Sequence, residues 1–312
     1  MQKFVIGIND AGQRLDKYLT KKFPQMPSGI LYKGIRKKRI KLNGKRAEAS
    51  VFLNEGDLLE LYINDEFLVV KQETADLSCI NPDLDIIYED ENLLLIDKKP
   101  GTSIHSDQTK NSIDLVTKIK AYLNQKDEFD SNDQSTFSPA VCNRLDKNTG
   151  GIVIAAKNAK TLRVINEKIR NNEIEKKYLC VADGVLEPKT ALLTAYHKKD
   201  AKLNKVYIFD TPDKDSKQIQ THYHVLKEKQ GKSLVEVTLI TGRTHQIRAH
   251  FAHIGHPLMG DKKYNPNLKS TGYKYQALYA YKLTFLFKEA CHLDYLNGKT
   301  FTVESVPFAL NF

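Results

Sequence analysis

Residues 141–151 place an arginine and an aspartate two positions apart, Arg144 and Asp146. They lead directly into residues 152–156, an apolar run that begins with β-branched residues and predicts a buried strand. Residues two apart in extended backbone point the same way, so Arg144 and Asp146 are expected to face one cleft. A carboxylate held on a rigid loop is a candidate nucleophile or base. An aspartate followed by Asn-Thr-Gly-Gly also suits a plain turn, and this stretch alone leaves both interpretations open.

A second stretch with reactive side chains, residues 241–261, begins with Thr-Gly-Arg-Thr-His-Gln-Ile-Arg and ends with Gly-His-Pro-Leu-Met-Gly-Asp. Thr244 is predicted to cap a helix that ends at Gly255. The residues expected to face the core are Ile247, Phe251 and Ile254. Arg243 and Arg248 then lie near the start of the helix, just after a central strand. We expect both arginines to belong to a site there.

Metal binding and two common kinds of enzyme site are not indicated. His250, His253 and His256 follow one another at intervals of three, but no cysteine pair or glutamate completes a zinc set, so helix-surface histidines are the favoured interpretation. No serine lies in a Gly-x-Ser-x-Gly turn, and no phosphate-binding glycine loop is present. We therefore expect no metal site.

The composition fits a globular protein with a polyanionic partner. The 312 residues have room for two domains, and the net charge of +10 favours nucleic acid over a membrane. Four cysteines without metal-binding spacing fit a reduced, cytoplasmic setting. The start lacks the apolar core of a signal peptide, and the apolar runs are too short to span a bilayer.

Residues 1–68 predict a small domain with two helices. Asp10 is expected to cap the first, in which Leu15 to Phe23 supply an apolar face, and the second begins at about Ser28. The second helix is expected to carry one exposed basic surface, made of Lys33, Arg36, Lys37, Lys38 and Arg39. Such a surface neutralises phosphates well, although a merely solvated basic face is the alternative. Residues 40–45 are expected to form a strand followed by a turn at the Asn-Gly dipeptide, and a further strand is expected at residues 58–63.

The order of these features resembles the S-four-like RNA-binding domain, a small two-helix module on a short sheet that grips structured RNA. The resemblance covers residues 12–65 and implies that this segment binds RNA. Residues 69–84 show no periodicity and are interpreted as a linker.

From residue 85 onward, strands outnumber helices and the two do not alternate strictly. The pattern predicts an α+β fold, with a mixed, largely antiparallel sheet flanked by helices at residues 112–123 and 159–171. The strands are expected at residues 86–89, 93–96, 152–156, 175–182, 205–209, 219–226, 234–240, 278–287 and 300–303. The polar run 198–216 is interpreted as a solvent-exposed loop rather than an RNA-facing one.

Four stretches occur in one order: Lys-Pro-Gly at 99–101, the Asn-Arg-Leu-Asp loop at 143–151, Glu-Lys-Lys-Tyr-Leu at 175–179 and the stretch 241–261. Together they resemble the family of pseudouridine synthases that modify large-subunit ribosomal RNA and, in some members, transfer RNA. The resemblance runs from about residue 85 to the C-terminus. It implies isomerisation of uridine to pseudouridine without a cofactor, by a chain expected to act as a cytoplasmic monomer.

The family motifs also imply roles for individual residues. Asp146 matches the catalytic aspartate, Arg248 the arginine that pairs with it, and Tyr178 a tyrosine that stacks on the base and assists proton removal. Arg144 matches the arginine that fills the stack where the target nucleotide leaves. Further RNA contacts are expected from Arg243, His245 and Gln246.

Three residues depart from the family pattern. Asn143 and Tyr279 stand where histidine is common, and Gly150 stands where many members have serine. These departures leave the substrate open. An RNA-binding ribosome assembly factor without catalysis, or a synthase acting on transfer RNA, remains the alternative.

Overall fold

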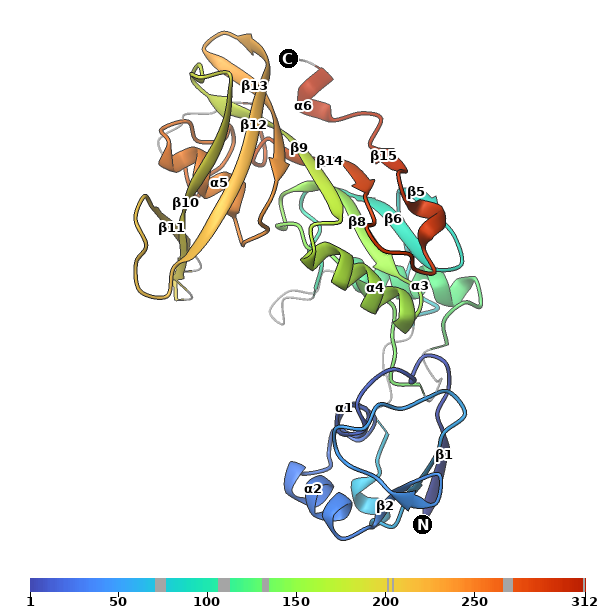
Figure 1. Ribbon diagram of the computed structural model, residues 1–312. Coiled ribbons are helices and arrows are strands. Elements are labelled where there is room, and N and C mark those ends of the chain that lie inside the picture. Colours follow the sequence, from blue (N-terminus) through green and yellow to red (C-terminus); the bar gives the residue numbers. More distant parts are fainter. Residues whose placement is uncertain are drawn as a thin grey trace. The chain divides into compact units, whose positions relative to one another are not determined.

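A computed structural model describes residues 1–70, 77–105, 113–130, 135–200, 202–203, 205–265, 272–310 and 312. The chain forms two compact units (Figure 1). The first contains residues 1–82, 117–140 and 156–163, and the second contains residues 83–116, 141–155 and 164–312. Two later segments therefore pack with the N-terminal residues, and the division of the chain at residues 68 and 84 stays a prediction.

Residues 1–70 form an antiparallel sheet with two helices. The elements are β1 (Gln2–Val5), α1 (Leu15–Lys22), α2 (Ser28–Arg36), β2 (Ile40–Leu42), β3 (Lys45–Arg46), β4 (Leu58–Leu61) and the 3-10 turn η1 (Asp65–Phe67), with sheet order β1-β4-β2-β3. Both predicted helices are confirmed. Asn43 and Gly44 join β2 to β3 with positive φ angles of 51° and 74°, which is the backbone of a tight type I′ hairpin.

The prediction that Asp10 caps α1 is wrong. The helix begins after Arg14, without a side-chain cap. The Asp10 carboxylate instead accepts hydrogen bonds from the Thr136 amide at 2.7 Å and hydroxyl at 2.6 Å. The Gln13 amide donates to the same hydroxyl at 2.9 Å. A partner 126 positions along the chain thus replaces the local cap, which sequence spacing cannot indicate.

The second unit is built on a large sheet with strand order β11-β10-β12-β13-β9-β14-β8-β6-β5 in the described chain. The strands are β5 (Ile86–Glu89), β6 (Leu93–Lys98), β7 (Ala140–Val141), β8 (Gly150–Ala156), β9 (Ile174–Asp183), β10 (Thr190–Asp200), β11 (Lys205–Phe209), β12 (Lys217–Lys229), β13 (Lys232–Leu239), β14 (Leu278–Phe285) and β15 (Thr300–Thr302). β9 and β14 run antiparallel side by side at its centre, whereas β14 and β8 are parallel (Figure 1). The predicted mixed sheet is confirmed.

Helices flank this sheet, as predicted. α4 (Ala159–Arg170) and α5 (Gln246–His253) pack against it. The other helical elements are α6 (Pro307–Leu310), the 3-10 turn η2 (Asp294–Leu296) and α3 (Leu115–Gln125), most of which belongs to the first unit. Ser112, the predicted start of α3, lies outside the described residues. No helix within the described ranges is long and apolar enough to cross a lipid bilayer.

The interpretation of residues 198–216 as a loop is wrong for residues 198–200 and 205–209, which are strand, whereas residues 210–216 lie outside the strands. Lys198 to Asp200 continue β10 and pair with β11 in an antiparallel hairpin. β10 itself was not predicted, and neither were β1 and β3. Exposed and more buried positions alternate along β10, but apolar and polar residue types do not alternate strictly in its sequence, which therefore gives a weak strand signal.

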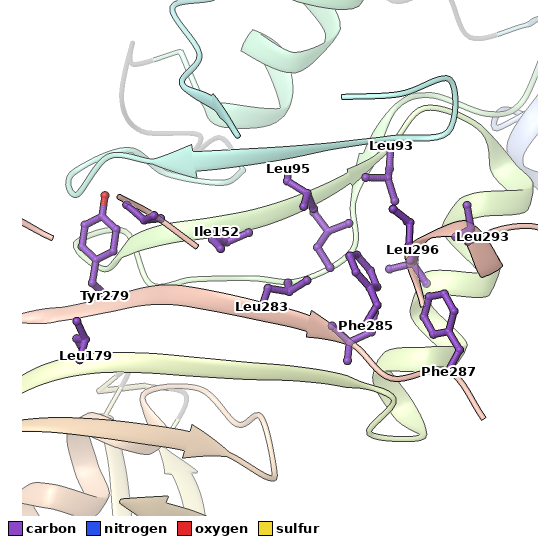
Figure 2. Packing of buried hydrophobic residues seen from close by; sticks show 14 of the residues in the cluster. Leu93, Leu95, Ile152, Leu179, Tyr279, Leu283, Phe285, Phe287, Leu293 and Leu296 are labelled. Carbon is purple, nitrogen blue, oxygen red and sulfur yellow. The ribbon is translucent and has the colours of Figure 1, made fainter. Parts of the chain in front are cut away.

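The main core of the second unit lies between β6, β8, β14 and the segment around η2 (Figure 2). Leu93 and Leu95 from β6 meet Ile152 from β8 and Phe285 from β14, and each is at most 2% exposed. Burying such a side chain contributes about 1.5–3 kcal/mol. This core fixes β8, and with it the end of the loop that carries Asp146.

Two departures from the family pattern, Gly150 and Tyr279, lie against each other. They face one another across the parallel pair β8 and β14. A Cβ atom on Gly150 would lie 2.2 Å from the Tyr279 ring, so only glycine fits beside this tyrosine. Figure 2 shows the ring rising from β14, and its hydroxyl donates to the Asp97 carboxylate at 2.7 Å. The tyrosine therefore occupies the space that a serine at position 150 would need.

We predict that Gly150→Ser and Tyr279→His compensate for each other. Overpacking makes Gly150→Ser alone cost about 1–3 kcal/mol of unfolding free energy or more. Tyr279→His alone leaves a cavity, and the double variant recovers part of both losses because the imidazole is smaller. Urea unfolding of the four proteins in a double-mutant cycle measures the coupling. Strictly additive losses would contradict the explanation.

Candidate active site

The loop between β7 and β8, residues 142–149, carries Asp146 and is tied down at both ends. At its start, the Asn143 side chain donates to the Ile152 carbonyl at 3.1 Å and accepts from the Ile154 amide at 2.8 Å. Near its end, the Lys147 carbonyl accepts from the Gly101 amide at 2.9 Å, and the Thr149 amide closes a turn by donating to the Asp146 carbonyl at 3.0 Å. The side chain of this asparagine, which departs from the family pattern, thus binds backbone groups of β8 as a neighbouring strand would.

Asp146 contacts an arginine that is 102 positions away in sequence. The Arg248 Nη1 donates to Asp146 Oδ2 at 2.8 Å. The other side of the same guanidinium binds Asp261 through two parallel bonds, Nε to Oδ2 at 2.7 Å and Nη2 to Oδ1 at 2.9 Å. Burial alone would lower the pKa of Arg248, but the hydrogen bonds and charges of Asp261 and Asp146 outweigh it and raise the pKa. The guanidinium is therefore permanently charged and fixed in orientation.

Helix α5 positions Arg248, but not with the predicted cap. His245, not Thr244, precedes the helix, in the left-handed conformation with φ 54°. Gln246 is 2% exposed, and its side-chain oxygen accepts from the Arg243 amide at 3.0 Å while its nitrogen donates to the Thr221 hydroxyl at 3.1 Å. The polar atoms of this amide thus bind protein groups, and the RNA contact expected from the sequence stays a prediction.

His245 lies between Asp146 and Tyr264. Its Nε2 is 3.8 Å from Asp146 Oδ2, and its Nδ1 is 2.9 Å from the Tyr264 hydroxyl. Burial lowers the pKa of His245 to about 4, although the charge of Asp146 opposes the shift. The imidazole is therefore neutral at pH 7, and Arg248 is the cation that balances Asp146 at short range. The Tyr264 ring also lies against the Arg248 guanidinium, 5.3 Å from its centroid.

Tyr178 comes from the central strand β9 and lines the same cleft. The residue is 6% exposed. Burial, assisted by the charge of Asp146, raises the pKa of its hydroxyl. The phenol therefore keeps its proton at neutral pH and can donate a hydrogen bond, whereas its ring offers a flat surface for a base.

The cleft has a volume of about 620 Å³, within the range of about 300–1,000 Å³ that is usual for small-molecule sites. It is lined by the Asp146 loop, the start of α5 and Tyr178. Arg144 and Arg243 also line it and are exposed. The expectation that Arg144 and Asp146 share a cleft is confirmed.

The remaining predicted RNA-binding residues belong to the first unit. Lys33, Arg36, Lys37, Lys38 and Arg39 are all exposed. The sequence places all five on a helix, but α2 ends at Arg36, and the last three form the turn into β2.

The three histidines at intervals of three bind three different partners. His250 Nδ1 lies 3.0 Å from the Thr221 hydroxyl, His253 Nε2 2.8 Å from Asp210, and His256 Nδ1 2.9 Å from a backbone carbonyl. Within the described ranges, no group of three or more His, Cys, Asp or Glu side chains has the arrangement of a metal site.

Sequence reasoning missed three residues of this region: Asp261, Tyr264 and Lys98. Asp261 was visible only as the last residue of a motif, and it is 1% exposed because it binds Arg248. An acidic residue soon after the helix that carries Arg248 is the one signal that could have indicated it. Tyr264 and Lys98 carry no local signal.

Comparison with known proteins identifies the family. The RNA pseudouridylate synthase family matches residues 92–253. An uncharacterized RNA pseudouridine synthase of Mycoplasma genitalium is 32% identical over 289 residues, which cover 91% of this chain and 88% of the relative. A protein of Rickettsia bellii named ribosomal large subunit pseudouridine synthase C is also 32% identical, covering 88% of this chain and 91% of its own.

The fold agrees with these sequence matches. The solved structure of human RNA pseudouridylate synthase domain containing 4 superposes with a TM-score of 0.57 at 20% identity, covering 72% of this chain and 90% of the human one. The family match spans more than half of the chain, and the relatives align over most of their length. This chain therefore belongs to the family of RNA pseudouridine synthases.

Proposed function

We propose that this chain converts specific uridines to pseudouridine in structured RNA of the large ribosomal subunit, with Asp146 as the catalytic residue. The observation that carries the proposal is the 2.8 Å bond between Asp146 and Arg248 inside the cleft. The Rickettsia bellii relative, named for the large subunit, supports the substrate class. A cytoplasmic location fits four cysteines that form no disulfide among the described residues.

The reaction is an isomerisation within one nucleotide, for which we propose one reactive carboxylate and no cofactor. The bond from uracil N1 to the sugar C1′ breaks, the uracil turns over, and its C5 bonds to C1′. One proton leaves C5 and one is gained at N1, so the composition of the nucleotide does not change. The Asp146 side chain is 18% exposed, which leaves it open to a nucleotide, while Arg248 at 8% is screened from solvent. Arg248 thus keeps the carboxylate aimed without competing for the cleft.

The target nucleotide must leave its helix to reach Asp146, at a cost of a few kcal/mol. Arg144 is exposed and stands two residues before Asp146, so its planar cation can fill the vacated stack. The ring of Tyr178 can stack on the base inside the cleft. Arg243 and His245, which also line the cleft, are proposed as further RNA contacts.

The first unit is proposed to bind RNA as an S-four-like domain. It has the two helices and short sheet of such a domain, and it exposes the five basic residues that follow or end α2. Five cations this close together bind phosphates and release counterions.

We predict that Asp146→Asn lowers pseudouridine formation by at least ~1,000-fold while RNA binding persists, because the amide is isosteric but uncharged. The measurement is carbodiimide modification and primer extension on large-subunit RNA, together with filter binding. Asp210→Asn is the matched control, because this aspartate is 86% exposed and lies outside the cleft lining. A normal rate in Asp146→Asn would refute the assignment.

We predict that Arg248→Lys slows a single turnover by roughly 10- to 100-fold, since one ammonium cannot bridge Asp146 and Asp261 as a guanidinium does. Asp261→Asn leaves Asp146 intact and is expected to cause a similar fall. Rapid-quench kinetics at saturating enzyme measure both rates. If both variants turn over like the wild type, the bridge has no role in catalysis.

We predict that replacing Lys33, Arg36 and Lys37 by Gln weakens RNA binding and lowers the slope of log K against log salt by about 2–3, because about 0.7–0.9 is lost per phosphate contact. The control replaces Lys227, Lys229 and Lys288, three exposed lysines of the second unit, and removes the same charge. Substitution is preferable to deletion because Asp10 and Gln13 bind Thr136. Equal slopes for the two triple variants would exclude a gripping role.

A further inference from the structure

Lys98, the last residue of β6, has an ammonium group buried inside the protein. The residue is 1% exposed. Its Nζ donates to the backbone carbonyls of Lys99 at 3.2 Å, Thr102 at 3.1 Å and Lys147 at 3.0 Å. These three bonds use all three protons of the ammonium. Among the described ion pairs, none involves Lys98.

One of these bonds reaches the loop that carries Asp146. Lys147 follows Asp146 directly, and its carbonyl accepts a second bond from the Gly101 amide at 2.9 Å. The turn from Lys98 to Thr102 therefore binds the backbone immediately after Asp146 through two hydrogen bonds. The side chain of Asp146 is held separately, by Arg248.

The buried ammonium also acts on Asp146 through its charge. Burial lowers the pKa of Lys98 to about 8, and the charges of Asp146 and Asp97 oppose the shift. The amine therefore loses its proton in the folded protein at a pH where an exposed lysine keeps it. The neutral amine has one donor fewer for the three carbonyls and no charge beside Asp146.

The charged and titratable groups around Lys98 come from three elements. Asp97 and Lys99 flank it, and they bind Tyr279 of β14 and Asp85 respectively. Asp146 and Lys147 come from the loop before β8. Of these, Asp146 has the larger electrostatic effect on Lys98 and Asp97 the smaller.

We propose that Lys98 is a positioning residue for Asp146, which it serves by holding the Lys147 carbonyl and by placing a positive charge beside the carboxylate. The inference rests on the proposed function of Asp146. It predicts that the protein works with Lys98 protonated, and that turnover slows as the pH rises through about 8.

The test is the pH profile of single-turnover pseudouridine formation, from pH 6.5 to 9.5, for the wild type, Lys98→Met and Lys98→Arg. The wild-type rate constant is expected to fall on the alkaline side with a midpoint near 8. Lys98→Met is expected to be roughly 10- to 100-fold slower at pH 7, with KM changed less than about threefold and without that fall. Lys98→Arg keeps the charge, so it is expected to turn over faster than Lys98→Met and to lose the fall as well.

The matched control is Lys168→Met. Lys168 is also buried, at 6% exposure, but it binds Glu173 at 2.7 Å and does not line the cleft. Its loss is expected to lower the melting temperature and to leave the alkaline fall in place. If Lys98 had only a structural role, Lys98→Met would behave like Lys168→Met, with a lower melting temperature and the alkaline fall retained.

Two outcomes overturn the proposal: a wild-type rate constant that is flat from pH 7 to 9.5, or an unchanged rate and midpoint in Lys98→Met. Should Lys98→Met fail to fold, the wild-type profile and Lys98→Arg decide, because an alkaline fall that persists in Lys98→Arg refutes the role. Failure of the proposed function looks different, since Asp146→Asn would then remain active or the wild type would form no pseudouridine.

Discussion

One guanidinium holds two carboxylates in the second unit, and the arrangement of the cleft depends on it. Asp261 is almost fully buried, and a buried carboxylate without a partner is costly. Two parallel bonds from Arg248 meet that need and leave Nη1 free to reach Asp146. A lysine could satisfy one acid or the other but could not fix the angle between them. The helix α5, the loop at Asp261 and the loop at Asp146 are thereby locked into one geometry.

The backbone of the Asp146 loop is fixed independently of this bridge. Asn143 bonds to β8 at one end, and the turn that contains Lys98 and Gly101 bonds to Lys147 at the other. β8 in turn is fixed by the core and by its close approach to β14. At Gly151 (φ +117°), an added Cβ would lie 2.2 Å from the Ala280 carbonyl oxygen, so no other residue is accommodated there. The Asp146 side chain is therefore held from its own backbone as well as from its partner, which is the preorganisation that its proposed catalytic role requires.

The sequence was sufficient where the signal is local or where motifs occur in a fixed order. The apolar run of β8, the helices α1, α2 and α4, and the mixed sheet followed from periodicity. The closeness of Asp146 and Arg248 followed only from the family resemblance, because 102 residues separate them. Both predicted caps failed for the same reason. Asp10 has a distant partner in Thr136, and Gln246 organises the start of α5 instead of Thr244. Long-range hydrogen bonds contribute in each case, because Asp10 binds Thr136 and the Gln246 amide also donates to the Thr221 hydroxyl.

The buried residues of the site were beyond sequence reasoning for a related reason. Lys98 stands at the end of an apolar strand and would ordinarily be assigned to the surface, where lysine is usually found. Only the three carbonyls that surround it show why an ammonium is tolerated there. The departures at positions 150 and 279 looked unrelated in sequence. A Cβ atom at position 150 would lie 2.2 Å from the Tyr279 ring, so the glycine is needed because the tyrosine is there.

The protonation states of the cleft follow from burial and define what the chemistry has to work with. His245 is neutral at pH 7 because its pKa is about 4, and Tyr178 stays protonated because burial and the charge of Asp146 raise its pKa. Neither group therefore has a pKa near 7, the value that best suits a base that accepts the proton from C5 at neutral pH. What the cleft offers an incoming uridine is a carboxylate held by a fixed cation, a phenol that donates and a flat ring. That combination suits bond exchange within one nucleotide, since the uracil that leaves the sugar through N1 bonds to it again through C5.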